Sequence, residues 1–304
     1  MSPSHNSPWR CFATLALKKN DAGEVLKFKR ICLNLRRINS LCTDGNSYSD
    51  SLPRVTDLFD ALAYALKDAG DDVLYSKIDI TQAFFSVELQ EENKPMFSFW
   101  TPRGARAMNT LSYGHKNSPS IFNGILSEQC LYGLLYKIAF CFMDDILSFP
   151  RGFQNMIKNL DVIFYRLMTF GFKLKPEKLS LAKSEVPMLG FVLKGPSVGL
   201  STSKLRTTET WPTPSNKDEV VSFVSFCNFL RRHVERFSAL SKPLYDLASK
   251  ETKEPFVWTN KANEAFLALK KAISTAPCLK LPRPGVPLFL FTDYLKLGLG
   301  YFLA

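Results

Sequence analysis

The sequence predicts an α+β protein in which strands and turns dominate the first third and helices dominate the last third. Short β-rich runs separated by turn residues occupy the N-terminal part, and apolar residues at helical spacing recur further along the chain. With 304 residues the chain is longer than one ordinary domain. With 46% hydrophobic and 22% charged residues, the chain has enough apolar side chains to bury a core, which excludes wholesale disorder. Its length argues against a single small binding module.

Hairpins and one helix are expected in the first part of the chain. Two β-rich runs flank Asn20–Gly23, whose composition is that of a turn, so they predict a hairpin. Ser51 and Pro53 supply an N-cap and a first-turn proline for the helix that follows. The elements expected here are strands at residues 12–19, 25–33 and 73–80, a helix at 55–66, and a second hairpin of residues 96–101 and 105–111.

Helices with one intervening hairpin are expected in the rest of the chain. Asp144 and Asp145 separate two short β runs, and Gly195-Pro196 together with Trp211–Asn216 interrupts regular structure, which predicts a domain boundary near residue 195. Pro282–Gly285 precedes a last strand. The elements expected here are helices at residues 121–134, 157–167, 220–232 and 263–273 and strands at 137–142, 146–149 and 287–292.

The charge of the chain indicates a polyanionic partner. Lys and Arg number 39 against 28 Asp and Glu, a net charge of +11. Residues 1–43 hold eight Lys or Arg and only two acidic residues. A basic chain of this kind favours nucleic acid, and the alternative is an ordinary solvated face.

The environment expected for the chain is intracellular. The seven cysteines are odd in number and scattered, with no C-x-x-C pair, so neither a disulfide framework nor a zinc site is indicated. No apolar run approaches the roughly 18 residues of a membrane helix, and the polar start Met1–Asn6 lacks the apolar core of a signal peptide. We therefore expect a cytoplasmic protein without membrane contact.

Three carboxylates carry the strongest chemical signal. Asp144 and Asp145 lie between two apolar β runs, where like charges held close cost stability that a divalent cation would relieve. Asp79 ends an apolar run, and a hairpin packed beside that strand would bring all three acids together. Hard oxygen ligands suit Mg²⁺, and paired Mg²⁺ ions serve in-line phosphoryl transfer. The alternative is a solvated turn.

An ordered series of motifs resembles the reverse transcriptase of long-terminal-repeat retroelements, most nearly the gypsy-type retrotransposon Pol polyprotein, along nearly the whole chain. The two acidic motifs, Ser76–Ile80 and Phe142–Asp145, resemble the family's S-K-L-D-L and Y-x-D-D. The other matching segments are Ser7–Trp9, Arg30–Asn39, Ser51–Arg54, Leu111–Asn123, Leu189–Phe191 and Trp211–Pro214.

The resemblance implies a right-hand polymerase with fingers, an antiparallel palm sheet and a helical thumb, followed by the start of a ribonuclease H-like fold. Asp79, Asp144 and Asp145 would be the catalytic residues and would hold two Mg²⁺ ions, with Mn²⁺ as a substitute. The implied divisions are fingers at residues 1–43 and 87–117, palm at 44–86 and 118–195, a thumb or connection-like helical region at 196–281, and the ribonuclease H-like start at 282–304.

The same resemblance assigns contacts to the incoming nucleotide and to nucleic acid. Arg30, with Lys18 or Lys19, would bind the triphosphate, and Phe84 would be an aromatic gate beneath the sugar. The remaining implied nucleotide contacts are Tyr113, Gly114, Phe142 and Met143, and the implied nucleic-acid contacts are Lys178 and Trp211. The alternatives are general backbone attraction for the basic residues, ordinary packing for Phe84, a simple turn at Gly114 and a solvated Lys178. His115 and His233 have no ligand-like spacing and are expected to be structural or to contact nucleic-acid backbone.

Several departures from the family pattern bear on activity. Ser112-Tyr113 stands where the family has Pro-Gln, so an amide becomes a phenol and lower turnover is expected. Asn34 replaces the usual Asp, and Phe142 replaces the usual Tyr. Asp293 resembles the first acid of a ribonuclease H site, yet the sequence ends eleven residues later. We therefore expect no ribonuclease H activity and an excised or decayed piece of a Pol polyprotein, cut at both ends.

The leading interpretation is an RNA-directed DNA polymerase, and the alternative is a catalytically decayed remnant that only binds nucleic acid. The expected partners are a primed RNA or DNA template, deoxynucleoside triphosphates and other Pol segments, within the cytoplasm or a virus-like particle.

Overall fold

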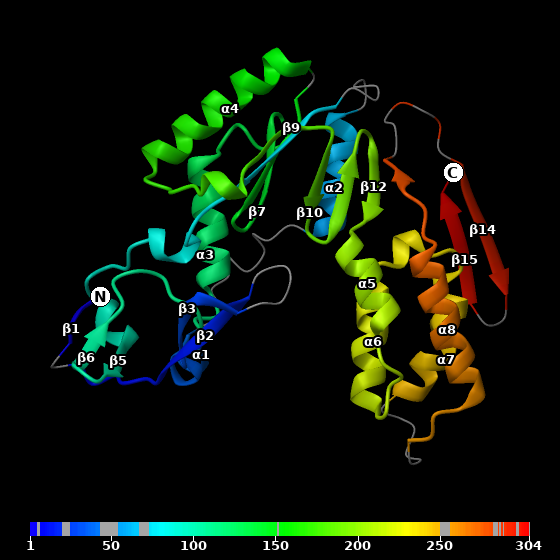
Figure 1. Ribbon diagram of the computed structural model, residues 1–304, viewed down its shortest axis with the longest axis horizontal. Coiled ribbons are helices and arrows are strands. Elements are labelled where there is room, and N and C mark those ends of the chain that lie inside the picture. Colours follow the sequence, from blue (N-terminus) through cyan, green and yellow to red (C-terminus); the bar gives the residue numbers. More distant parts are fainter. Residues whose placement is uncertain are drawn as a thin grey trace. The chain divides into compact units, whose positions relative to one another are not determined.

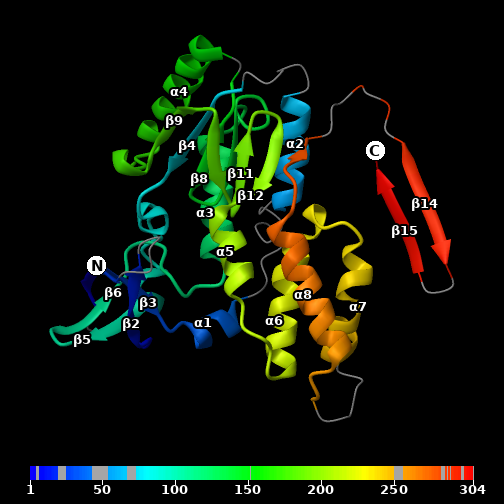
Figure 2. The ribbon, with the colours of Figure 1, turned by 45° about the vertical axis from the view of Figure 1, so that its right-hand side comes forward.

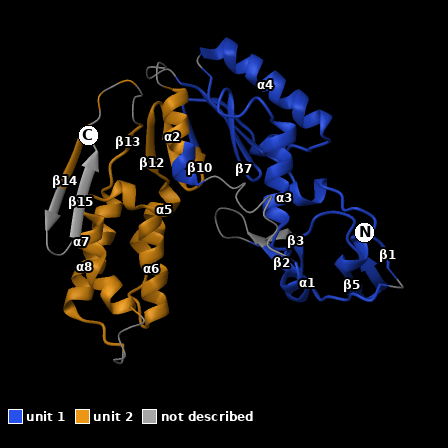
Figure 3. Ribbon diagram, turned by 180° about the vertical axis from the view of Figure 1, so that it is seen from behind, with its two compact units in different colours: residues 1–58, 72–186 blue, residues 59–71, 187–304 orange. Residues whose placement is uncertain are grey.

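Two compact units divide the chain, and each contains segments from two parts of the sequence. One unit comprises Met1–Leu58 with Asp72–Val186, and the other comprises Phe59–Asp71 with Pro187–Ala304 (Figure 3). The computed structural model describes residues 1–4, 7–19, 25–42, 54–66, 73–150, 152–249, 256–281, 285, 287, 289–295 and 298–303. For residues 18, 19, 26–29, 293–295 and 298–303 it describes the backbone and not the side chain. The predicted turn at Asn20–Gly23 and the predicted cap at Ser51 and Pro53 lie outside the described residues.

An antiparallel sheet forms the centre of the first unit. Its order is β7-β8-β4-β9, from strands β7 (Ala139–Phe142), β8 (Asp145–Ser148), β4 (Tyr75–Asp79) and β9 (Ser180–Lys183). Ile78 lies opposite Ile146 and both are fully buried, whereas the next pair is Asp79 opposite Asp145. Because side chains alternate along a strand, the isoleucines and the aspartates point to opposite faces of the sheet.

Helices cover the isoleucine face of this sheet. They are α3 (Ser118–Gly124), which continues as a π-helical segment Ile125–Cys130, and α4 (Gly152–Thr169). Figures 1 and 2 show both helices beside the sheet. Their contacting side chains are buried in one cluster with Ile78 and Ile146: Phe122, Leu126, Ile163 and Leu167. The side chains of Asp79 and Asp145 therefore point away from this cluster, at one end of a face that also carries buried Leu147 and Phe140.

The N-terminal elements build the rest of the first unit. Strands β2 (Ala13–Lys19) and β3 (Val25–Leu33) form the predicted hairpin, which the short helix α1 (Arg36–Leu41) follows. A three-stranded sheet has the order β1-β6-β5, from β1 (Ser2–Pro3), β6 (Gly104–Ala107) and β5 (Ser98–Thr101). Between β4 and β5 lie 3-10 helices η1 (Ala83–Ser86) and η2 (Lys94–Phe97). Leu33, Leu35, Ile38, Phe97, Phe99 and Met108 form one buried cluster that joins these pieces.

The second unit is mainly helical. A four-stranded sheet has the order β10-β11-β12-β13, from β10 (Glu185–Met188), β11 (Phe191–Lys194), β12 (Ser197–Leu200) and β13 (Leu279–Lys280). The helices are α2 (Val55–Ala65), which begins in the first unit, α5 (Thr202–Thr210), α6 (Lys217–Phe229), α7 (Phe237–Ala248) and α8 (Asn260–Ser274). The chain then forms the hairpin of β14 (Leu290–Leu295) and β15 (Gly298–Leu303).

Side-chain caps fix where three of these helices begin. Ser201, Asn216 and Thr259 each accept a hydrogen bond from the backbone N–H three residues later. Among the described helices, none is long and apolar enough to cross a membrane.

Most predicted elements are present, and the differences have local causes. The helix predicted at residues 121–134 is wrong in extent, because it begins at Ser118 and its helical hydrogen bonding ends at Cys130. Gly133 and Tyr136 then take positive φ values of 77° and 64°, which break the helical path. The strand predicted at 287–292 lies at Leu290–Leu295. Elements that were not predicted include α1, α5, α7 and the strands β9 to β12.

Candidate active site

Three aspartates gather at one end of the β4 and β8 strands. Asp79 and Asp145 are direct partners in the antiparallel register, and the backbone N–H of Ile80 donates to the carbonyl oxygen of Asp144 at 2.9 Å. The connection from β7 to β8 is only Met143-Asp144, and Met143 has a φ of 52°. The N–H of Met143 donates to Oδ1 of buried Asn123 at 3.3 Å, which ties this tight turn to α3. The grouping expected from the sequence is thus present in the backbone.

Two lysines engage the aspartate side chains. Lys178 Nζ, at the end of the 3-10 helix η4 (Pro176–Lys178), donates to both carboxylate oxygens of Asp79 at 2.7 and 2.8 Å. Lys77 Nζ lies 3.1 Å from Asp145 Oδ1. Burial raises the pKa of the Asp145 carboxyl, the Lys77 charge opposes that rise, and the negative charges of Asp144 and Asp79 add to it. Asp144 itself is exposed.

The expected convergence of the three carboxylates into one metal-ligand set stays a prediction. Within the described part of the chain, no three Asp, Glu, His or Cys side chains lie close enough together to hold a metal ion. Asp79 and Asp145 are paired with different ammonium groups, those of Lys178 and Lys77. The donor chemistry nevertheless fits a hard divalent cation, because three carboxylates share one strand end and two of them already attract positive charge.

A cluster of aromatic rings and one arginine lies beside the aspartates. Phe84 of η1 contacts Tyr113 and Phe122 with ring centroids 5.1 and 5.9 Å apart, and Phe85 contacts Tyr113 at 5.6 Å. The guanidinium of Arg30, on β3, lies 5.4 Å from the Tyr113 ring centre, which is a cation–π contact. Burial raises the pKa of the Tyr113 hydroxyl, the Arg30 and Lys178 charges oppose the rise, and the Asp144 charge adds to it. Tyr113 thus lies within electrostatic reach of the acidic group.

The loop after Tyr113 is fixed by its neighbours in the same unit. Gly114 has a φ of 106°, and a Cβ placed there would lie 2.1 Å from the carbonyl oxygen of Leu33. Glycine is therefore required by close approach to β3 as well as by backbone conformation. Asn39 of α1 donates to the Gly114 carbonyl at 2.8 Å. Sequence reasoning did not single out Asn39, although an asparagine inside a short helix is a weak signal that its amide has another use.

The remaining predicted site residues are scattered. The side chains of Lys18, Lys19 and Asp293 lie outside the described residues, and the backbones of these residues belong to β2 and β14. Trp211, in the second unit, packs its ring 4.9 Å from Phe226 and 5.5 Å from Phe223, so it contributes to an aromatic core there. Phe142 and Met143 are half-buried at the turn beside Asp144.

The two histidines have structural contacts. His233 Nε2 lies 3.3 Å from the Val198 carbonyl oxygen, and burial lowers the pKa of its ring. His115 packs 5.4 Å from the Phe97 ring, and burial lowers its pKa as well.

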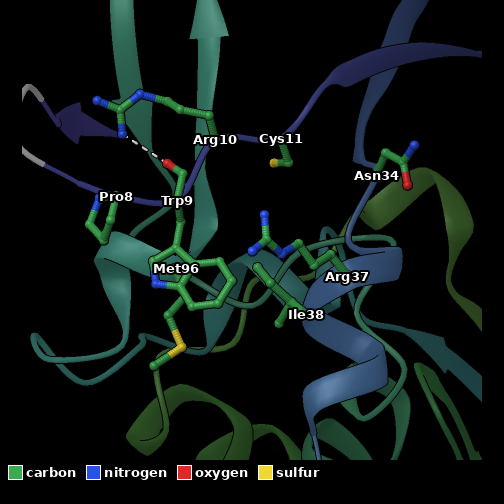
Figure 4. Close-up of a pocket in the computed structure, with 8 residues that line it drawn as sticks. All are labelled: Pro8, Trp9, Arg10, Cys11, Asn34, Arg37, Ile38 and Met96. Atoms are coloured by element: carbon green, nitrogen blue, oxygen red, sulfur yellow. Dashed lines mark hydrogen bonds between the residues drawn. The ribbon is translucent and has the colours of Figure 1, made fainter.

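A pocket of about 230 Å³ lies in the first unit and contains none of the three aspartates (Figure 4). The guanidinium of Arg37 points into it, 5.7 Å from the ring centre of Trp9, while Arg10 donates to the Trp9 carbonyl at 2.8 Å. The rest of its wall is Pro8, Cys11, Asn34, Ile38 and Met96. The wall of the pocket combines cationic and aromatic groups. Because none of the three aspartates lines it, the pocket is separate from the acidic strand end.

A family model described as "Reverse transcriptase (RNA-dependent DNA polymerase)" matches residues 17–193, more than half of the chain. The chain belongs to the reverse transcriptase family. A second model, "RNase H-like domain found in reverse transcriptase", matches residues 258–304. That range includes α8 as well as the hairpin β14–β15. The retroelement origin expected from the motifs is confirmed.

Relatives of this reverse transcriptase family member come from transposons and retroviruses. The chain is 29% identical over 297 residues to the retrovirus-related Pol polyprotein from transposon 412 of Drosophila melanogaster, covering 97% of this chain and 23% of that protein. It is 30% identical over 227 residues to the Gag-Pol polyprotein of walleye dermal sarcoma virus, covering 72% of this chain and 13% of that protein. The chain thus spans less than a third of the length of either relative.

Solved structures show the same fold. The foamy viral protease-reverse transcriptase in complex with dsDNA matches with a TM-score of 0.79 and 20% identity, covering 99% of this chain and 60% of that chain. The same type of protein in complex with an RNA/DNA hybrid matches with a TM-score of 0.73 and 19% identity, covering 96% of this chain and 39% of that chain. The right-hand polymerase fold expected from the motifs is confirmed.

Replacing Gly114 by alanine should destabilise this family member more than the same change at Gly104. Both glycines have positive φ values, 106° and 95°, so both variants carry backbone strain of about 1 to 3 kcal/mol. Only at Gly114 does the new Cβ meet a backbone oxygen, whereas nothing lies within 4 Å at Gly104. Urea unfolding should therefore show a clearly larger loss for Gly114→Ala, and equal losses would contradict the close approach to β3.

Proposed function

We propose that this chain is an RNA-directed DNA polymerase that adds deoxynucleotides to a primer 3′-OH. The observation that carries the proposal is the grouping of Asp79, Asp144 and Asp145 at one end of the β4 and β8 strands. A reaction that transfers phosphoryl groups needs charge neutralisation at such a point, and membership of the reverse transcriptase family supports the assignment.

The three aspartates would act together as the metal-binding and catalytic residues. Asp79 and Asp145 stand opposite each other on adjacent strands and Asp144 occupies the exposed turn, so all three can offer oxygen to a Mg²⁺ or Mn²⁺ ion. When bound, the metal supplies the charge that lowers the pKa of the 3′-OH and stabilises the leaving pyrophosphate. Before metal and substrate bind, Lys178 and Lys77 would neutralise the negative charges of Asp79 and Asp145.

The aromatic cluster would receive the nucleotide beside the aspartates. Arg30 presents a guanidinium next to the Tyr113 ring, which suits a triphosphate whose negative charge grows in the transition state. Lys18 and Lys19 follow on the neighbouring strand β2 and are proposed for the same anion. Phe84 contacts Tyr113, so the two rings together would form the surface that meets the sugar. Gly114, Phe142 and Met143 are further proposed nucleotide contacts.

Nucleic acid is the proposed macromolecular partner. The net charge of +11 supports binding to a primed RNA or DNA template, and the foamy viral structures contain dsDNA or an RNA/DNA hybrid. We assign fingers to residues 1–43 and 87–117, palm to 44–86 and 118–195, a thumb or connection-like region to 196–281 and a ribonuclease H-like start to 282–304. Trp211 and Lys178 are proposed nucleic-acid contacts. The cytoplasm or a virus-like particle, with other Pol segments, is the proposed setting, since the relatives are Pol and Gag-Pol polyproteins.

A nucleic-acid-binding remnant without synthesis is the second candidate. The observation in its favour is Tyr113, a bulky phenol held between Phe84 and Arg30 where the family pattern has a glutamine. Extension of an oligo(dT) primer on poly(rA) with Mg²⁺ decides between the two, because binding without extension selects the remnant.

Asp144→Asn should abolish primer extension while template binding stays largely intact. The exposed Asp144 carboxylate makes little contribution to folding, so its loss removes metal charge rather than structure. Extension and template affinity should be measured together. Asp161→Asn, an exposed acid on α4, is the control and should extend normally. An Asp144→Asn protein that fails to fold would show that this acid is structural.

Phe84→Ala should admit ribonucleotides if its ring lies beneath the incoming sugar, because the 2′-OH would no longer overlap the ring. Incorporation of deoxynucleotides and ribonucleotides should be compared side by side with a melting curve for each variant. Phe85→Ala is the matched control, since Phe85 also contacts Tyr113. Loss of both activities with a lowered melting point would instead assign Phe84 to packing, which costs roughly 3 to 5 kcal/mol when a phenylalanine is truncated in a core.

Affinity for a primer-template duplex should fall steeply as NaCl rises. Lys and Arg side chains neutralise phosphates and release counterions, so the logarithm of the binding constant should decrease linearly with the logarithm of salt concentration. Duplexes of unrelated sequence should give similar slopes. A flat response in the titration would show that the excess positive charge does not face the nucleic acid.

A further inference from the structure

One side-chain amide holds the loop that carries Tyr113 and Gly114. Asn39 Nδ2 donates to the Gly114 carbonyl at 2.8 Å, and Asn39 Oδ1 accepts from the backbone N–H of Lys116 at 3.0 Å. The donor and the acceptor of the amide are therefore both used, on two nearby points of the same loop. Asn39 is half-buried on α1. A bridge of this kind fixes the loop in position as well as in orientation.

Further contacts hold the same loop between β3 and α1. The backbone N–H of Leu33 donates to the Tyr113 carbonyl at 3.0 Å, and Lys116 Nζ donates to the Cys42 carbonyl at 2.8 Å. His115 lies 3.5 Å from Cys42 Sγ through its Nε2. The loop thus has a backbone attachment on the β3 side, and the Asn39 amide is the attachment that reaches both Gly114 and Lys116.

The held loop presents Tyr113 to the acidic group. The Tyr113 ring contacts Phe84 at 5.1 Å and Arg30 at 5.4 Å, the two side chains that the proposed function gives to sugar and triphosphate. A shift of the Gly114 backbone would move Tyr113 with it, because the two residues are adjacent. The carboxylates are held separately by Lys77 and Lys178, so such a shift leaves them in place.

We propose that Asn39 is a positioning residue for the incoming nucleotide, which sets the place of Tyr113 without itself touching substrate. This inference rests on the proposed polymerase function. Loosening of the loop lowers the fraction of protein ready to bind nucleotide, so it raises KM for the deoxynucleotide. It leaves kcat and primer-template affinity near their original values, because neither the carboxylates nor the basic surface changes.

Two Asn39 variants test the donor and the acceptor of the side-chain amide separately. Asn39→Ala removes both hydrogen bonds, and Asn39→Asp keeps the acceptor for the Lys116 N–H while losing the donor to Gly114. We expect each to raise KM for the deoxynucleotide about five- to tenfold, the effect of losing one or two hydrogen bonds. Hydrogen exchange of the Lys116 amide, measured without substrate, should accelerate about tenfold in Asn39→Ala and remain near the original rate in Asn39→Asp.

Ser40→Ala is the matched control, because Ser40 Oγ donates to the Arg37 carbonyl within the same helix. It should leave KM and Lys116 exchange unchanged. An unchanged KM in both Asn39 variants would overturn the proposal. A rise in KM would also overturn it if template affinity fell equally and amide hydrogen exchange became faster throughout β5 and β6. If the unaltered protein extends no primer, the proposed function fails, and the exchange of Lys116 then tests the loop attachment by itself.

Discussion

The antiparallel pairing of β4 with β8 is the constraint on which the rest of the candidate site depends. Ile78 opposite Ile146 and Asp79 opposite Asp145 are successive steps of one ladder, so burial of the first pair fixes the direction of the second. A slip of one residue would place an aspartate in the cluster around Ile78 and an isoleucine at the acidic strand end. The helices α3 and α4 favour this register because their buried side chains pack in one cluster with Ile78 and Ile146.

Placing two aspartates opposite each other costs stability, and the structure offsets that cost with nearby cations. Like charges directly across a pair of strands repel, and burial of Asp145 adds a desolvation penalty. Lys77 and Lys178 supply positive charge to Asp145 and Asp79. Under the proposed function, a divalent cation would compete with these two lysines for the carboxylate oxygens.

Sequence alone predicts those parts of the site that depend on local pattern. Asp79 and the Asp144-Asp145 turn could be grouped because a strand followed by a hairpin leaves few arrangements. The contact of Lys178 with Asp79 could not be predicted, because it joins residues far apart in sequence and depends on where β9 pairs. Asn39 was missed because α1 has only six residues and little periodicity. The π-helical Ile125–Cys130 was missed since its apolar spacing resembles that of an ordinary helix.

The strand order β7-β8-β4-β9 also has a consequence for synthesis of the chain. Strand β4 leaves the ribosome first but occupies an interior position, with β8 on one side and β9 on the other. Its hydrogen-bonding groups therefore stay unpaired while the segments that hold β7, β8 and α4 are still being made, and β9 comes last. Pairing at such long sequence separation is slow and leaves apolar strands such as β4 open to association with other nascent chains. The pairing of Asp79 with Asp145 therefore cannot form until the β8 segment has been synthesised, and β4 gains its second neighbour only with Ser180–Lys183.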